Sequence, residues 1–172
     1  MKIPMPTTTR RRFATLALLL AASAPALARQ PTPQSAFTLP QLKALAALSP
    51  DAFRQEVRRL GFSYVDRTAT EEVSMIEYDR FADGQTARLM KSTYAGHRAA
   101  ENSVELSLTD KAAFDRLVKE VRDAGFVPAE KGRIPGGETY QDYKRSSEVV
   151  RFVHPAKRTG SSPPSYTTVV WR

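Results

Sequence analysis

Apolar residues recur at two different spacings along the chain, and these spacings predict which segments are helices and which are strands. Helical spacing, with three or four residues between apolar positions, occurs at 39–48, 50–60 and 110–124. Alternating or short apolar runs between turn residues predict strands in the remaining sequence. The expected strands are 62–66, 73–81, 86–94, 103–108, 126–130, 138–144, 148–154 and 166–172.

Polar residues mark where each expected helix begins. Thr38 and Gln41 have the spacing of a capping box, in which both side chains bind free amides of the first turn. Ser49 is a suitable N-cap for the second helix, with Pro50 in the first turn. Thr109 is expected to cap the third helix.

Two of the expected helices end in the same way, 64 positions apart. Gly61-Phe62 follows the second helix, and Gly125-Phe126 follows the third. Glycine readily adopts the positive φ that ends a helix, and the phenylalanine then returns the chain to the core. This pattern predicts an internal duplication.

The same offset relates two expected strands, because 103–108 falls on 167–172. We therefore expect an α+β fold of two tandem units, each made of a helix and a four-stranded antiparallel sheet. The first unit, 38–108, carries an extra N-terminal helix, and the second unit is 109–172. Together the two units are expected to form one compact domain.

The first 28 residues have the three zones of a secretory signal. A basic start is followed by an apolar run at 13–24 and by the small-x-small sequence Ala26-Leu27-Ala28. We expect cleavage after Ala28, a flexible leader at 29–37 and a periplasmic location for the mature protein.

The apolar run of the signal is about half of the ~20 residues that a transmembrane helix needs, so no membrane span is expected. Residues 9–13 also resemble the twin-arginine export motif. Ala14 and Thr15 stand where that motif prefers a large apolar residue and a lysine. The export route, general secretion or twin-arginine, stays open.

Charge gives little support for a nucleic-acid partner. The chain has a formal charge of +8, but removal of 1–28 takes away four of the 26 basic residues and none of the 18 acidic ones, which leaves +4. Nucleic-acid binding usually requires a clustered basic stripe, whereas here the charges are mixed along the chain. No nucleic-acid partner is expected.

The chain contains no cysteine, which excludes disulfides, thiolate metal sites and a cysteine nucleophile. Its two histidines, His97 and His154, have no neighbours at metal-ligand spacing. We expect the first in a loop and the second at a strand end. No metal ion or other cofactor is predicted.

Other catalytic patterns are weak. Glu77 and Asp79 would alternate onto one strand face, but they lie among basic residues and are expected to be solvated. The glycines of 132–137 join two strands and lack the ending of a phosphate-binding loop. No catalytic residue is predicted, and an enzyme is the least favoured class.

Aromatic and basic residues interleave in the expected strands, and these types dominate protein interfaces. In the strand 138–144, alternation puts Tyr140 and Asp142 on one face and Tyr143, with Arg145, on the other. At least one tyrosine there should be exposed. The predicted partner-binding residues are Tyr78, Arg80, Tyr94, Tyr140, Tyr143, Arg145, Arg151 and Trp171.

In element order, period and length, the tandem layout resembles the β-lactamase inhibitory protein family and the small periplasmic immunity proteins. The inhibitor family carries disulfides that this chain cannot form, and no binding residue is carried over. The resemblance implies a non-enzymatic periplasmic protein that neutralises an exported enzyme or toxin by steric occlusion of its active site. Its partner would be a secreted or periplasmic effector or hydrolase.

A second hypothesis is that the protein binds lipid or cell-wall polymer rather than a protein partner. Lys131, Arg133, Lys157 and Arg158 could bind anionic lipid or cell-wall polymer. Such binding would weaken steeply with salt because the contacts are screened, whereas occlusion of a protein partner would persist.

Overall fold

The computed structural model describes residues 37–96, 101–156 and 163–172. The expected signal peptide lies outside the described residues, as do 29–36 of the expected leader. His97, Lys157 and Arg158 also lie outside them. Among the described residues, no helix is long and apolar enough to cross a membrane.

Three helices and eight strands make up the described chain. The helices are α1 (Leu39–Ala47), α2 (Pro50–Arg59) and α3 (Lys111–Asp123). The strands are β1 (Ser63–Ala69), β2 (Val73–Ala82), β3 (Gln85–Tyr94), β4 (Ser103–Leu108), β5 (Val127–Arg133), β6 (Thr139–Arg145), β7 (Glu148–His154) and β8 (Tyr166–Trp171).

All eight strands belong to one antiparallel sheet in the order β1-β2-β3-β4-β8-β7-β6-β5. The predicted combination of helices with antiparallel strands is confirmed, but the prediction of two separate four-stranded sheets is wrong. The strands β4 and β8 pair along their whole length, from Ser103 opposite Trp171 to Leu108 opposite Tyr166. This pairing satisfies backbone groups that two separate sheets would leave open at their edges.

Both outer strands of the sheet are irregular. In β1 the pairing register shifts between Tyr64 and Asp66, and in β5 it shifts between Pro128 and Lys131. A bulge or a proline on an edge strand interrupts the row of free backbone groups that another strand would pair with. The sheet is therefore regular at its centre and irregular at its borders.

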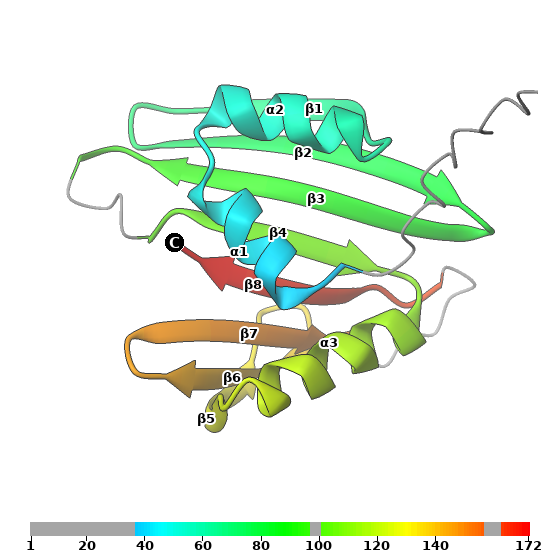
Figure 1. The fold of residues 1–172 in the computed structure, drawn as a ribbon, viewed down its shortest axis with the longest axis vertical. Coiled ribbons are helices and arrows are strands. Elements are labelled where there is room, and N and C mark those ends of the chain that lie inside the picture. Colours follow the sequence, from blue (N-terminus) through cyan, green and yellow to red (C-terminus); the bar gives the residue numbers. More distant parts are fainter. Residues whose placement is uncertain (1–36, 97–100, 157–162) are drawn as a thin grey trace, which may run out of the picture. The chain divides into compact units, whose positions relative to one another are not determined.

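All three helices lie on the same face of the sheet (Figure 1). The helix α1 contacts both β4 and β8, so it covers the line where the two halves of the sheet meet, and α3 also contacts both strands. Among the described residues, no helix covers the opposite face, which we call the uncovered face.

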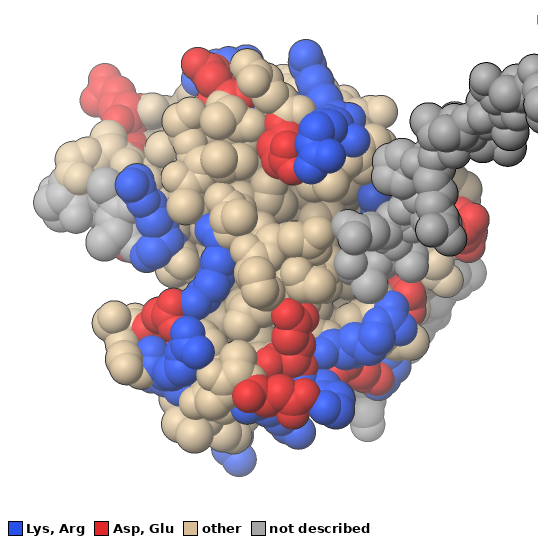
Figure 2. Space-filling view, viewed as in Figure 1, with Lys and Arg blue, Asp and Glu red and all other residues tan. Residues whose placement is uncertain are grey.

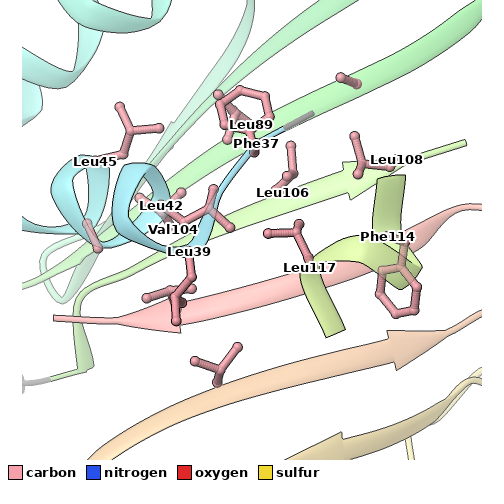
Figure 3. Packing of buried hydrophobic residues seen from close by; sticks show 14 of the residues in the cluster. Phe37, Leu39, Leu42, Leu45, Leu89, Val104, Leu106, Leu108, Phe114 and Leu117 are labelled. Atoms are coloured by element: carbon pink, nitrogen blue, oxygen red, sulfur yellow. The ribbon is translucent and has the colours of Figure 1, made fainter. Parts of the chain in front are cut away.

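The core lies between the helices and the sheet (Figure 3). Leu39 and Leu42 of α1 lie against Val104, and Leu117 of α3 lies beside Leu106 (Figure 3). Figure 2 views the same helix-bearing side and shows Lys and Arg interspersed with Asp and Glu rather than gathered in one patch.

The end of α2 is fixed by its glycine and by an arginine from the sheet. Gly61 has φ of 83°, and the amide of Phe62 donates to the carbonyl of Val57 at 3.0 Å. From β2, Arg80 Nη1 donates to the carbonyl of Leu60 at 3.1 Å, and its guanidinium lies 4.8 Å from the centre of the Phe62 ring.

The end of α3 has the same construction. Gly125 has φ of 82°, and the amide of Phe126 donates to the carbonyl of Val121 at 3.2 Å. From β6, Arg145 Nη1 donates to the carbonyl of Ala124 at 2.9 Å, and its guanidinium lies 4.7 Å from the centre of the Phe126 ring. The predicted glycine endings of both helices are thus confirmed.

The helix beginnings differ from expectation at one point. The capping box of Thr38 and Gln41 and the Ser49 cap are confirmed. Asp110, and not Thr109, caps α3 by accepting a hydrogen bond from the amide of Ala113 at 3.1 Å. The Thr109 hydroxyl instead accepts a hydrogen bond from the Thr86 amide in β3.

Lys91 of β3 attaches the C-terminal end of α1 to the sheet. Its side chain is only 2% exposed, and Nζ donates to the carbonyls of Leu45 at 3.3 Å and Ala46 at 2.9 Å. A cation at a helix C-terminus is favoured by the helix dipole. Burial, with a smaller contribution from the charge of Arg172, lowers the pKa of Lys91 to about 8.

Candidate functional site

The eight residues predicted to bind a partner divide between the two faces of the sheet. Tyr78 is 0% exposed and packs edge-on against Phe53 of α2. Tyr143 is also buried, and its hydroxyl accepts two hydrogen bonds from the Arg122 guanidinium of α3. Both tyrosines therefore belong to the core under the helices.

Arg80 and Arg145 also lie on the helix-bearing side, at the helix ends described above. Arg145 is further bound to Glu148 at 2.7 Å. Their guanidinium groups are engaged with the fold itself, so these two arginines belong to its construction.

The other four, Tyr94, Tyr140, Arg151 and Trp171, lie on the uncovered face. Residues that are directly opposite on paired strands point to the same face of a sheet. The side chain of Arg151 is opposite those of Val169 and Asp142 on the neighbouring strands, and it reaches over the rings of Tyr140 and Trp171. Tyr140 and Tyr143 thus lie on opposite faces of β6, as the alternation predicted.

Arg151 organises the β5–β8 half of the uncovered face. Its guanidinium donates to both carboxylate oxygens of Asp142, at 2.7 and 2.9 Å. It lies 4.1 Å from the centre of the Tyr140 ring and 5.6 Å from that of Trp171. The hydrogen bonds to Asp142 raise the pKa of Arg151. The result is a rigid arrangement of two aromatic rings around one paired cation.

Gly132 of β5 is necessary for this arrangement, although sequence reasoning assigned it only to a connecting loop. It is opposite Tyr140, and a Cβ added at this glycine would lie 2.7 Å from the tyrosine ring. The ring therefore lies directly over the glycine backbone, and the Tyr140 hydroxyl donates to Glu130 at 2.5 Å. A glycine that pairs with an aromatic residue on the next strand is a known arrangement in sheets, so Gly132 and Tyr140 were the available sequence signal for this contact.

The β1–β4 half of the uncovered face is acidic. Glu77 and Asp79 of β2 both bind Arg88 of β3, at 2.9 and 2.8 Å. Asp66 lies opposite Glu77 on β1. The carboxylates predicted to be solvated are thus half-buried and share one arginine.

Glu105 lies at the centre of the uncovered face, on β4. Its opposite residues are Met90 on β3 and Val169 on β8. Burial raises the pKa of Glu105. Within the described part of the chain, its carboxylate has no hydrogen bond or ion pair.

Sequence reasoning did not select Glu105. It lies in a strand where polar and apolar residues alternate, which indicates only that one face is wet. Its burial comes from Met90 and Val169, which are distant in sequence, so no local signal marked it.

The described residues contain no group of three or more metal-ligating side chains. His154 lies at a strand end, as expected, and packs edge-on against Phe114 with ring centres 5.2 Å apart. A pocket of about 260 Å³ opens beside the β2–β3 turn. It is lined by Arg80, Ala82, Asp83, Gln85, Thr86, Ala87, Leu108 and Asp110.

Comparison with known proteins adds no further evidence: no family model, curated protein or solved structure matches this chain.

Proposed function

We propose that this chain is an exported, non-catalytic binding protein that neutralises an exported enzyme or toxin by docking it on the uncovered face of the sheet. The observation that carries the proposal is the composition of this face. Tyrosine, tryptophan and arginine, which are the commonest anchors of protein interfaces, lie on the same face as the apolar Met90 and Val169.

The size of the face suits a protein partner. Strands about 4.8 Å apart and residues about 3.4 Å apart along a strand give eight strands of six residues an area of about 700 Å². A typical stable interface takes about 800 Å² from each partner. The uncovered face alone approaches that area.

Rigidity also favours occlusion. Six of the eight strands are paired on both sides, so their backbone has little freedom to lose on binding. The arginines Arg88 and Arg151 are already held by carboxylates of neighbouring strands. A preformed surface of this kind can block a cleft without itself changing shape.

The test is a site-specific photo-crosslink in the full-length protein. A benzoylphenylalanine in place of Val153, on the uncovered face, should capture one envelope protein, while the same group in place of Gln55 on α2 should not. The purified partner should then lose its own activity on stoichiometric addition of this protein. Equal adducts from both positions, or an unaffected partner, would reject the proposal.

The second hypothesis, binding to anionic lipid or cell-wall polymer, is tested in the same preparation. Lys131 and Arg133 are exposed in β5. Binding to anionic vesicles or cell-wall polymer that disappears at high salt, without a protein adduct at position 153, would favour that reading instead.

A further inference from the structure

The fold does not require a carboxylate at the position of Glu105. It lies on β4, next to the line where the two halves of the sheet join, and it is flanked by Met90 and by Val169, which is only 8% exposed. A carboxylate surrounded by apolar side chains loses hydration. An apolar or neutral residue would suit the same position better.

The cations of the uncovered face do not compensate this charge. Arg88 is bound to Glu77 and Asp79, and Arg151 is bound bidentately to Asp142. These pairs run across neighbouring strands, within the surface. In the described part of this face, Glu105 at the centre and Asp66 at the β1 edge are then left without an ionic partner, and of these two Glu105 is the one flanked by apolar side chains.

The β1–β4 half of the face, which includes Glu105, is negative, whereas beyond Val169 the nearest cation in the same row, Arg151, is already paired with Asp142. Among the described residues of the β1–β4 half, Asp66, Glu77, Asp79 and Glu105 are opposed by one arginine, Arg88. Such a surface attracts a basic partner segment and repels an acidic one. The negative charge of this half of the face therefore favours a basic partner segment.

We infer that the partner inserts a lysine or arginine side chain against Glu105, with the aliphatic stem lying on Met90 and Val169. This inference rests on the proposed function and identifies the recognised group. A long cationic side chain combines an apolar stem with a charged head, which matches a carboxylate between two apolar residues. When a charge pair is shielded from water on complex formation, removing one partner leaves the other buried and unpaired, and this weakens binding.

The first experiment uses defined peptides and the chain's single tryptophan, Trp171, as the reporter on this face. In 150 mM salt, hexa-arginine amide should change Trp171 fluorescence saturably, and hexaglutamate should not. Glu105→Gln should weaken the arginine peptide at least tenfold. The matched variant Glu71→Gln, in the exposed turn between β1 and β2, should stay within twofold of wild type.

Equal weakening by Glu71→Gln, or none by Glu105→Gln, would overturn the inference. A response to tetramethylammonium as strong as the response to the peptide would also overturn it, because the stem contacts would then be unnecessary. Circular dichroism spectra should be the same for both variants, which separates loss of binding from loss of fold.

A second experiment keeps this inference distinct from the proposed function. The crosslink at position 153 is repeated in the Glu105→Gln background, and the affinity of the purified partner is measured by calorimetry. A captured partner with unchanged affinity would refute the role of Glu105 and leave the docking face intact. No adduct in either background would refute the docking face itself.

Discussion

The two faces of the sheet use polar side chains in different ways. Under the helices, Lys91, Arg80 and Arg145 each end on backbone carbonyls, and Arg122 ends on the Tyr143 hydroxyl. These contacts run between layers and attach helices to strands.

On the uncovered face, ion pairs run across neighbouring strands and join β2 to β3 and β6 to β7. They leave the outer side of the surface free for another molecule. The comparison indicates that stability resides mainly under the helices, so side chains on the uncovered face can change at a smaller cost to the fold.

The largest expected difference between the faces is in packing. Phe114 is 0% exposed and lies 5.4 Å, centre to centre, from the Phe152 ring. Phe114→Ala should lower the free energy of unfolding by about 3–5 kcal/mol because it opens a cavity. Trp171→Ala, on the uncovered face, should cost about 1 kcal/mol or less. Urea denaturation followed by circular dichroism measures both, and equal losses would remove the distinction between the faces.

The next effect is the pH dependence created by Lys91. Because its pKa is about 8 in the folded protein and 10.5 when unperturbed, the unfolded chain binds more protons between these values, and stability rises with pH there. We expect a gain of about 2 kcal/mol between pH 7 and pH 10 in wild type. Lys91→Met should abolish this gain in chemical denaturation series. A variant with the wild-type slope would show that another group is responsible.

The two helix ends allow a matched test within the helix-bearing side. Gly61→Ala and Gly125→Ala each place a Cβ at φ near 82°, which should cost about 1 kcal/mol apiece. The built Cβ lies 3.8 Å from Arg80 in one case and 4.0 Å from Arg145 in the other, so no clash adds to either cost. Thermal unfolding should give equal losses. A difference beyond 1 kcal/mol would show that the two ends are energetically unlike.

The smallest expected effect is a gain in stability, whereas the packing and glycine substitutions above lower it. Because the pKa of Glu105 is raised in the folded protein, the folded state holds this proton longer, and stability falls as pH rises through that range. Glu105→Gln should therefore stabilise the protein at pH 7, by on the order of 0.5 kcal/mol. Denaturation at pH 4 and pH 7 should show the gain only at the higher pH. Destabilisation at pH 7 would mean that the carboxylate supports the fold.

The local parts of the fold could be predicted from the sequence. The glycine endings at Gly61 and Gly125 depend on short-range rules of backbone geometry. The order of helices and strands along the chain depends on side-chain alternation, which is also local. The joining of β4 to β8 could not be predicted. Apolar residues alternate with polar ones in β4, and this pattern is the same at the edge of a small sheet as at the centre of a large one.

The candidate site was predicted in part. Tyr140, Arg151 and Trp171 lie together on the uncovered face. Tyr78 and Tyr143 alternate with charged residues along their strands and point toward the helices. Residue type alone does not distinguish the two faces, because a tyrosine suits either environment. Glu105 owes its character to strands 15 and 64 positions away in sequence, so only the assembled sheet reveals it.

The position of β8 beside β4 also determines when the sheet can form during synthesis. The strands β1 to β4 can fold into a meander early, but the inner edge of β4 stays open until residues 166–171 have been made. Pairing across such a sequence separation slows folding. The sheet therefore stays incomplete, and the chain accessible to chaperones, until residues 166–171 can pair with β4.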